Sequence, residues 1–121
     1  MKHNGFEYVD LGLPSGTKWA RCNIGADKET NCGLYFSWGE TKGYDSPNGA
    51  KIFDRHHYKF SNKSFLCKFT KYNNTDGKKV LDLCDDAAHI HMGGKWHMPT
   101  DEQIRELIKN TENIWVTDYN N

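Results

Sequence analysis

Residues 85–110 carry the strongest local folding signals in this chain. Thr100 is followed three residues later by Gln103, the spacing of a capping box in which each side chain binds a free backbone amide at a helix start. Apolar residues then repeat at the spacing of one helical face: Ile104, Leu107 and Ile108. The pattern predicts an amphipathic helix over residues 100–110.

A shorter helix is predicted directly before it, over residues 86–92. Asp85 or Asp86 is suited to cap its first turn, since aspartate oxygens accept hydrogen bonds from free backbone amides there. The Gly-Gly pair at 93–94 tolerates the positive φ angles at which helices end. Trp96, just beyond the glycines, is expected to be a buried anchor.

Short segments elsewhere predict strands. Residues 6–11 and 17–22 flank a Pro-Ser-Gly turn at 14–16 and are expected to pair as a hairpin. Residues 34–38 and 114–117 are rich in aromatic and β-branched residues and predict two further strands. Short strands beside two helices, without a repeating strand-helix-strand order, predict a single α+β domain over the whole 121-residue chain.

Composition excludes two classes of partner. Lys plus Arg and Asp plus Glu both total 16, so the formal net charge is zero and no cationic field favours a nucleic acid. No apolar run approaches the roughly 20 residues that span a bilayer, so no membrane insertion is expected. The N-terminus also lacks the apolar core of a signal peptide.

The four cysteines are widely spaced and include no Cys-x-x-Cys pair: Cys22, Cys32, Cys67 and Cys84. Structural zinc sites usually take their cysteines in close pairs, so a four-cysteine zinc site is disfavoured. We expect free thiols, while three different pairings into two disulfides remain open.

Several ordered blocks cover most of the chain: residues 7–20, 22–26, 33–41, 66–72, 80–82, 85–89 and 93–100. The first block contains Tyr-Val-Asp-Leu-Gly-Leu-Pro-Ser-Gly-Thr-Lys-Trp-Ala, and the last two contain Asp-Asp-Ala-Ala-His and Gly-Gly-Lys-Trp-His-Met-Pro-Thr. Together they resemble the Fibrobacter succinogenes major paralogous domain family. That family is common in Bacteroidetes and frequently forms part of secreted or surface lipoproteins.

The resemblance implies a C-type-lectin-like fold, grouped with formylglycine-generating-enzyme-like domains, in which short antiparallel strands lie beside the two helices. It also implies display of a ligand or partner rather than catalysis. Two residues depart from the family pattern: Met92 stands where an aromatic residue is usual, and His97 where arginine is usual. Family members continue past the second helix into further strands, so this sequence is expected to lack the C-terminal part of the domain. We therefore hypothesise a homo-oligomer that covers the apolar face of residues 100–110.

A metal site is the alternative reading of the same stretch. The histidines with ligand atoms for zinc are His89, His91 and His97, and the candidate oxygen ligands for calcium are Asp82, Asp85 and Asp86. A helix over 86–92 would separate His89 from His91, and helix capping already explains the aspartates. A structural role is favoured for five residues: Asp85, Asp86, Trp96, Thr100 and Gln103.

The aromatic residues suggest where a ligand binds. Rings in loop-like sequence are expected to be exposed and to contact ligand: Tyr44, Phe53, Tyr58, Phe60 and Phe65. The remaining rings considered are expected to be mostly core: Trp19, Tyr35, Phe36, Trp38 and Trp96. Because no phosphate loop or nucleophile elbow appears, we predict no enzyme and no cofactor. The predicted function is a binding or structural interaction module for a glycan or a protein.

Overall fold

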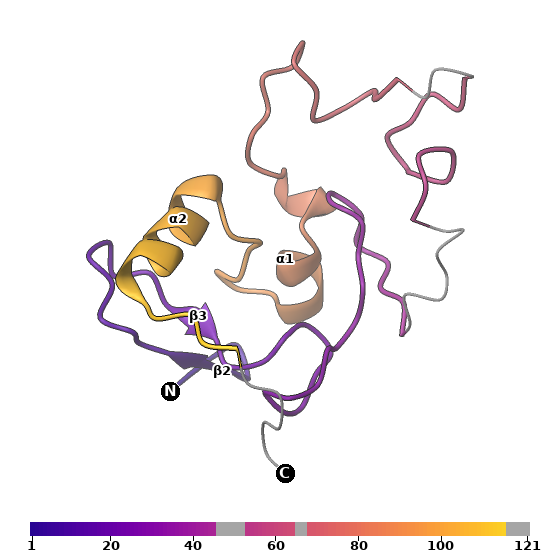
Figure 1. Cartoon of the computed structure of the whole chain (residues 1–121). Helices are drawn as coiled ribbons and strands as arrows, with labels where there is room; N and C mark the ends of the chain where they lie inside the picture. The colour runs from indigo at the N-terminus through magenta and orange to yellow at the C-terminus, as the bar shows by residue number, and fades with distance from the viewer. Residues whose placement is uncertain (46–52, 65–67, 116–121) are drawn as a thin grey trace.

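The computed structural model describes residues 1–45, 53–64 and 68–115, and within them an antiparallel three-stranded sheet lies beside two α-helices (Figure 1). The strands, in the order β1-β2-β3 across the sheet, are β1 (Lys2–His3), β2 (Phe6–Val9) and β3 (Trp19–Ala20). The helices are a short 3-10 turn η1 (Leu83–Asp85), α1 (Ala87–Met92) and α2 (Asp101–Asn110). This mixture confirms the predicted α+β class.

The N-terminal strands pair through two turns. Asn4 and Gly5 join β1 to β2 with φ angles of 54° and 85°, as a tight turn with two positive φ angles requires. β2 pairs with β3 antiparallel, which confirms the predicted hairpin, although both strands are shorter than predicted. β2 stops at Val9 because the Asp10 carboxylate accepts a hydrogen bond from the Gly12 amide at 2.9 Å and turns the chain locally.

The prediction of a strand over residues 34–38 is wrong. Tyr35 pairs with Tyr44 in an isolated bridge, with N–O distances of 2.8 and 3.0 Å, and the ladder does not extend on either side. A Cβ atom on Gly43 would lie 2.8 Å from Cβ of Leu34, so the two segments cross closely instead of running side by side. Residues 114–115 are also not in a strand, and residues 116–117 lie outside the described residues.

Both predicted helices are confirmed, and their ends follow the capping signals. Thr100 Oγ1 accepts from the Gln103 amide at 3.2 Å while the Gln103 side chain accepts from the Thr100 amide at 2.9 Å. Asp86, rather than Asp85, caps α1 by accepting from the His89 amide at 3.0 Å. Gly93, with φ 71°, ends α1 as predicted.

The apolar core is small and lies around α1. Its buried apolar residues are Leu13, Phe60, Leu81, Ala87, Ala88 and Met92. α2 has no buried residue, and it is attached to the turn before β3 by Ser15, whose amide and hydroxyl both donate to the Glu106 carboxylate at 3.0 and 2.6 Å. The amphipathic face of α2 is therefore largely open to solvent.

Residues 53–64 and 68–79 follow long irregular paths on the side of α1 and η1 away from the sheet (Figure 1). An isolated bridge between Ser61 and Phe69 and a hydrogen bond from the Thr70 amide to the Phe60 carbonyl, 2.5 Å long, tie these two paths together. No helix in the described part of the chain is long and apolar enough to cross a membrane.

Candidate functional site

The larger of two neighbouring hollows, here called the apolar hollow, has a volume of about 470 Å³. It lies between β3, the segment 32–36, α1 and the segment 95–99. Its principal apolar residues are Trp19, Ile24, Leu34, Phe36, Met92 and Trp96. Six polar side chains also line it, namely Thr17, Lys18, Asn23, Lys95, His97 and Gln103. An apolar concavity of this size with a few polar groups is typical of a small-ligand site.

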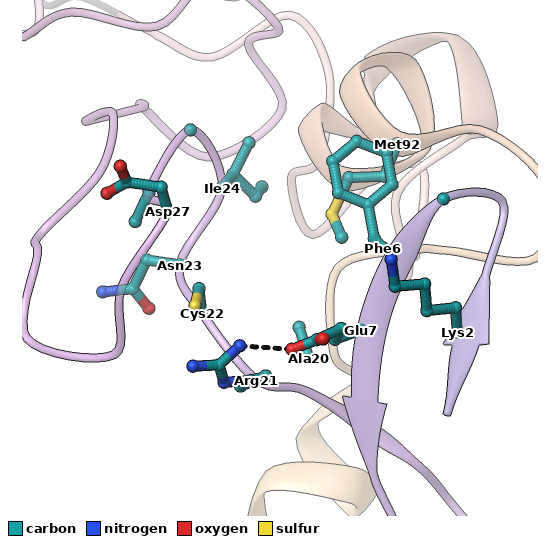
Figure 2. Close-up of a pocket in the computed structure, with 13 residues that line it drawn as sticks. Lys2, Phe6, Glu7, Ala20, Arg21, Cys22, Asn23, Ile24, Asp27 and Met92 are labelled. Carbon is teal, nitrogen blue, oxygen red and sulfur yellow. Dashed lines mark hydrogen bonds and ion pairs between the residues drawn. The ribbon is translucent and has the colours of Figure 1, made fainter.

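The second hollow, here called the charged hollow, has a volume of about 400 Å³ and is shown in Figure 2. Arg21 lies on its wall and forms an ion pair with Glu7 and another with Glu29, the latter at 2.6 Å. The hydrogen bond from Arg21 lowers the pKa of the Glu7 carboxyl. Because both carboxylates already hold this guanidinium, the charged hollow offers a ligand little unpaired charge there.

The chain segment 20–24 separates the two hollows, since Ala20, Cys22 and Ile24 line both. The Leu34 amide donates to the Ile24 carbonyl at 2.8 Å and closes the loop between them. Gly33 makes this closure possible, because a Cβ atom there would lie 2.3 Å from the Ile24 carbonyl oxygen.

Trp96 connects the apolar hollow to the N-terminal strand β1. Its indole N–H donates to the His3 carbonyl at 2.8 Å, and the His3 ring accepts from the Lys95 amide at 2.8 Å. The Trp96 side chain is half-buried rather than fully buried, with one side on β1 and another on the apolar hollow. Its predicted role as an anchor is thus carried by hydrogen bonds as well as by packing.

The three histidines of the alternative metal site do not come together. Each contacts a different backbone carbonyl: His89 that of Trp96 at 3.2 Å, His91 that of Thr41 at 2.7 Å, and His97 that of Met98 at 2.7 Å. Within residues 1–45, 53–64 and 68–115, no group of three His, Cys, Asp or Glu side chains is placed to hold a metal ion.

The cysteines described by the structure are free: Cys22, Cys32 and Cys84. Cys22 is half-buried and Cys32 exposed, and both line the apolar hollow. Cys67 lies outside the described residues.

The rings predicted to contact ligand are largely packed on one another. Phe60 is buried, so its predicted exposure is wrong, and it meets Tyr58 edge-to-face with centroids 5.7 Å apart. Tyr44 and Phe53 are half-buried and form a second edge-to-face pair at 5.5 Å. Phe65 lies outside the described residues. A small chain that is poor in aliphatic residues uses these rings as local core, which explains why loop-like sequence did not leave them exposed.

Phe69 and Trp38 are among the exposed rings that the sequence did not single out as contact sites. Phe69 is 40% exposed, and Trp38, which was predicted to be core, is 45% exposed. Both border Tyr58, whose ring lies 5.2 Å from that of Phe69 and whose hydroxyl donates to the Trp38 carbonyl at 2.6 Å. Trp38 is therefore an exception to the expectation that these rings are mostly core.

Asp85 is the buried charge beneath these rings. Its carboxylate accepts from Lys71 Nζ at 2.6 Å and from the Tyr72 hydroxyl at 2.7 Å, and Lys59 Nζ lies 3.5 Å away. Burial would raise the pKa of Asp85, but the hydrogen bonds from Lys71 and Tyr72 and the charges of Lys71 and Lys59 lower it to about 2. The predicted structural role of Asp85 therefore takes the form of an ion-pair centre rather than a helix cap.

No protein-family model matches this sequence, and neither the curated proteins nor the solved structures compared with it give a match.

Proposed function

We propose that this chain is a non-catalytic binding domain of the Fibrobacter succinogenes major paralogous type with a C-type-lectin-like architecture. The ordered residue blocks described above support that assignment. The capped α1, the glycine break and the capped α2 give the segment 85–110 a local structure that suits a family-defining core. The α+β arrangement with antiparallel strands is compatible with the same architecture.

The apolar hollow is the proposed ligand site, and its geometry is the observation that carries this proposal. A glycan or a segment of a partner protein would place a ring or an aliphatic group between Trp19 and Trp96, which both line the hollow. The Trp19 indole N–H is buried and has no hydrogen-bond partner among the described residues. An oxygen of the ligand that reached this group would remove an unfavourable desolvation cost.

Filling the hollow is expected to block binding. Ala20 lines both hollows, whereas Ala26 lines only the charged hollow. We expect Ala20→Leu to weaken binding of the fluorescent apolar probe anilinonaphthalene sulfonate about tenfold, as a loss of about 1.4 kcal/mol implies. Ala26→Leu, which adds the same atoms, should leave probe affinity unchanged. Titration followed by the fluorescence of the probe measures both affinities.

The proposal fails if the two variants bind the probe equally, provided that circular dichroism shows both to be folded. The same pair of variants then serves in glycan-array and peptide-array experiments. Ligands whose signal disappears with Ala20→Leu and persists with Ala26→Leu are bound in the apolar hollow.

We further propose that two copies of this chain associate through the open face of α2. Ile108 is 58% exposed, and Trp115, five residues after the helix, is 89% exposed. The acidic residues Asp101 and Glu102 lie in the first turn of α2 and Lys109 in its last. An antiparallel pair of α2 helices about a two-fold axis would bury the apolar face and place opposite charges together.

Disrupting this face is expected to give a monomer. In light scattering at about 100 μM, the wild-type chain should have twice the 14.0 kDa chain mass, and Ile108→Glu should have the mass of one chain. Asn110→Glu adds the same charge about 200° away around the helix and should remain dimeric. A wild-type chain that is monomeric at this concentration would rule the dimer out.

A further inference from the structure

Although the net charge of this chain is zero, positive charge is concentrated in one segment and negative charge in the rest of the chain. Residues 53–79 contain seven Lys or Arg and two Asp, which gives a formal charge of +5 with histidine neutral. The remainder of the chain therefore carries −5. The described residues of this basic segment, 53–64 and 68–79, lie away from the sheet in Figure 1.

Part of this charge is already neutralised. Lys71 pairs with Asp82 at 2.7 Å and with Asp85 at 2.6 Å, and Lys78 pairs with Asp82 at 3.2 Å. Arg55, Lys63 and Lys68, by contrast, form no ion pair within the described ranges of the chain. Their charges are available to an external anion.

One unpaired cation lies over an exposed ring. The Arg55 guanidinium is 5.5 Å from the centre of the Phe69 ring, and Lys63 Nζ donates to the backbone carbonyl of Tyr58. The Tyr58 ring in turn contacts the Phe69 ring, with centroids 5.2 Å apart. We call this set the basic aromatic surface: Arg55, Tyr58, Lys63 and Phe69.

The backbone holds this surface in place. The bridge between Ser61 and Phe69 sets the position of the Phe69 ring, and the Asn62 amide donates to the Lys68 carbonyl at 2.9 Å. Ser61 and Phe60 beneath the surface are buried. The exposed rings are thus supported by a local ladder, and little ordering is required when a ligand binds.

We propose that the basic aromatic surface binds an acidic glycan, that is, a sugar chain with carboxylate or sulfate groups. The Arg55 guanidinium lies over the Phe69 ring, 5.5 Å from its centre, so cation and ring form one stacked pair. An acidic sugar unit carries an anion and apolar C–H groups, which can contact the edge of this guanidinium and the exposed part of the ring together. Guanidinium groups bind carboxylates and sulfate-like oxyanions through two parallel hydrogen bonds.

The charges favour a short acidic glycan over a nucleic acid. Tight binding to a nucleic acid requires many phosphate contacts, and Arg55, Lys63 and Lys68 would supply few. The −5 charge on the rest of the chain would also repel a long polyanion. The site is independent of the apolar hollow, because none of its four residues lines that hollow.

Titration calorimetry with three probes tests the proposal: an oligogalacturonate hexamer, neutral cellohexaose and a single-stranded hexanucleotide. We expect the acidic hexamer to bind, cellohexaose to bind at least tenfold more weakly, and the affinity for the acidic hexamer to fall as salt rises. Binding of the hexanucleotide as tight as that of the acidic sugar, or equal binding of both sugars, would overturn the proposal. So would the absence of binding by all three.

Single-residue variants test whether the acidic hexamer binds at the basic aromatic surface. Arg55→Gln and Phe69→Ala should each weaken oligogalacturonate binding at least fivefold, while Lys28→Gln, which removes one exposed cation far along the chain from this surface, should change it less than twofold. Equal losses for Arg55→Gln and Lys28→Gln would show that only the net charge matters and would refute the site. Ala20→Leu should bind this probe normally, so failure of the apolar hollow as a site and failure of this surface give different results.

Discussion

Asp86→Ala is expected to lower the free energy of unfolding by about 3 kcal/mol. Asp86 is 2% exposed, and its carboxylate joins two parts of the chain. It accepts from the His89 amide at 3.0 Å at the start of α1, and both of its oxygens accept from the Met98 amide, at 2.9 and 2.8 Å. Loss of a helix cap costs about 1 kcal/mol, and a partly buried amide left without a partner costs about 1–3 kcal/mol more.

Urea unfolding monitored by circular dichroism measures this loss. Asp86→Asn keeps one oxygen of the same shape and should lose about half as much. Asp101→Ala is the matched control, because Asp101 also lies at a helix start but forms an exposed ion pair with Arg105, at 2.8 Å. That change should cost less than about 0.5 kcal/mol. If Asp86→Ala and Asp101→Ala unfold at the same urea concentration, Asp86 does not hold these segments together.

The contrast between these two aspartates shows what local sequence predicts well. The helix boundaries followed from Thr100, Gln103, Asp86 and Gly93, since a cap acts on amides within three or four residues of itself. The second bond of Asp86, to Met98 twelve residues away, has no local signal. Capping was therefore predictable, while the tertiary role that makes the residue important was not.

Strands were predicted less well because their stability depends on a partner elsewhere in the chain. Residues 34–38 have the composition of a strand, but only Tyr35 finds a partner, at Tyr44. β1 was missed although the Asn4-Gly5 pair is a strong hairpin turn signal that was present in the sequence. For residues 34–38 the composition predicts a strand that lacks a partner strand, whereas for β1 the turn signal at Asn4-Gly5 is local and correct.

The candidate ligand surfaces could not be predicted from the composition of the whole chain, because they depend on local charge and on how side chains pack. A zero net charge argued against anionic partners, yet summing charge over residues 53–79 alone would have revealed a basic segment. Which rings in that segment are exposed depends on how they pack on each other, and neither hydrophobicity nor spacing separates Phe60 from Phe69. The apolar hollow likewise joins residues from 17 to 103 and has no contiguous motif.

Asp85, the neighbour of Asp86, accepts hydrogen bonds from two residues of the basic segment, Lys71 and Tyr72. We expect Asp85→Ala to lower the free energy of unfolding by about 3–4 kcal/mol, because it leaves Lys71 and Tyr72 without the buried carboxylate that they bind. Asp82 binds Lys71 at a similar distance, 2.7 Å, but its side chain is 41% exposed. Asp82→Ala should therefore cost less than about 1 kcal/mol.

The same ion pair predicts how the wild-type chain responds to acid. The pKa of Asp85 in the folded chain is about 2, below its ordinary value of 3.8, so the folded state favours the charged carboxylate. The resulting stabilisation, about 2 kcal/mol, is fully present above about pH 4 and is lost as the pH falls through 2.

Urea unfolding of the wild-type chain and of Asp85→Asn at pH 6, 4, 3 and 2 tests this dependence. The difference in stability between the two should shrink steadily from pH 4 to pH 2, whereas parallel curves would show that Asp85 does not carry the acid sensitivity. Because Lys71 and Tyr72 bind Asp85 from within the basic segment, acid should release that segment from η1 as this difference disappears.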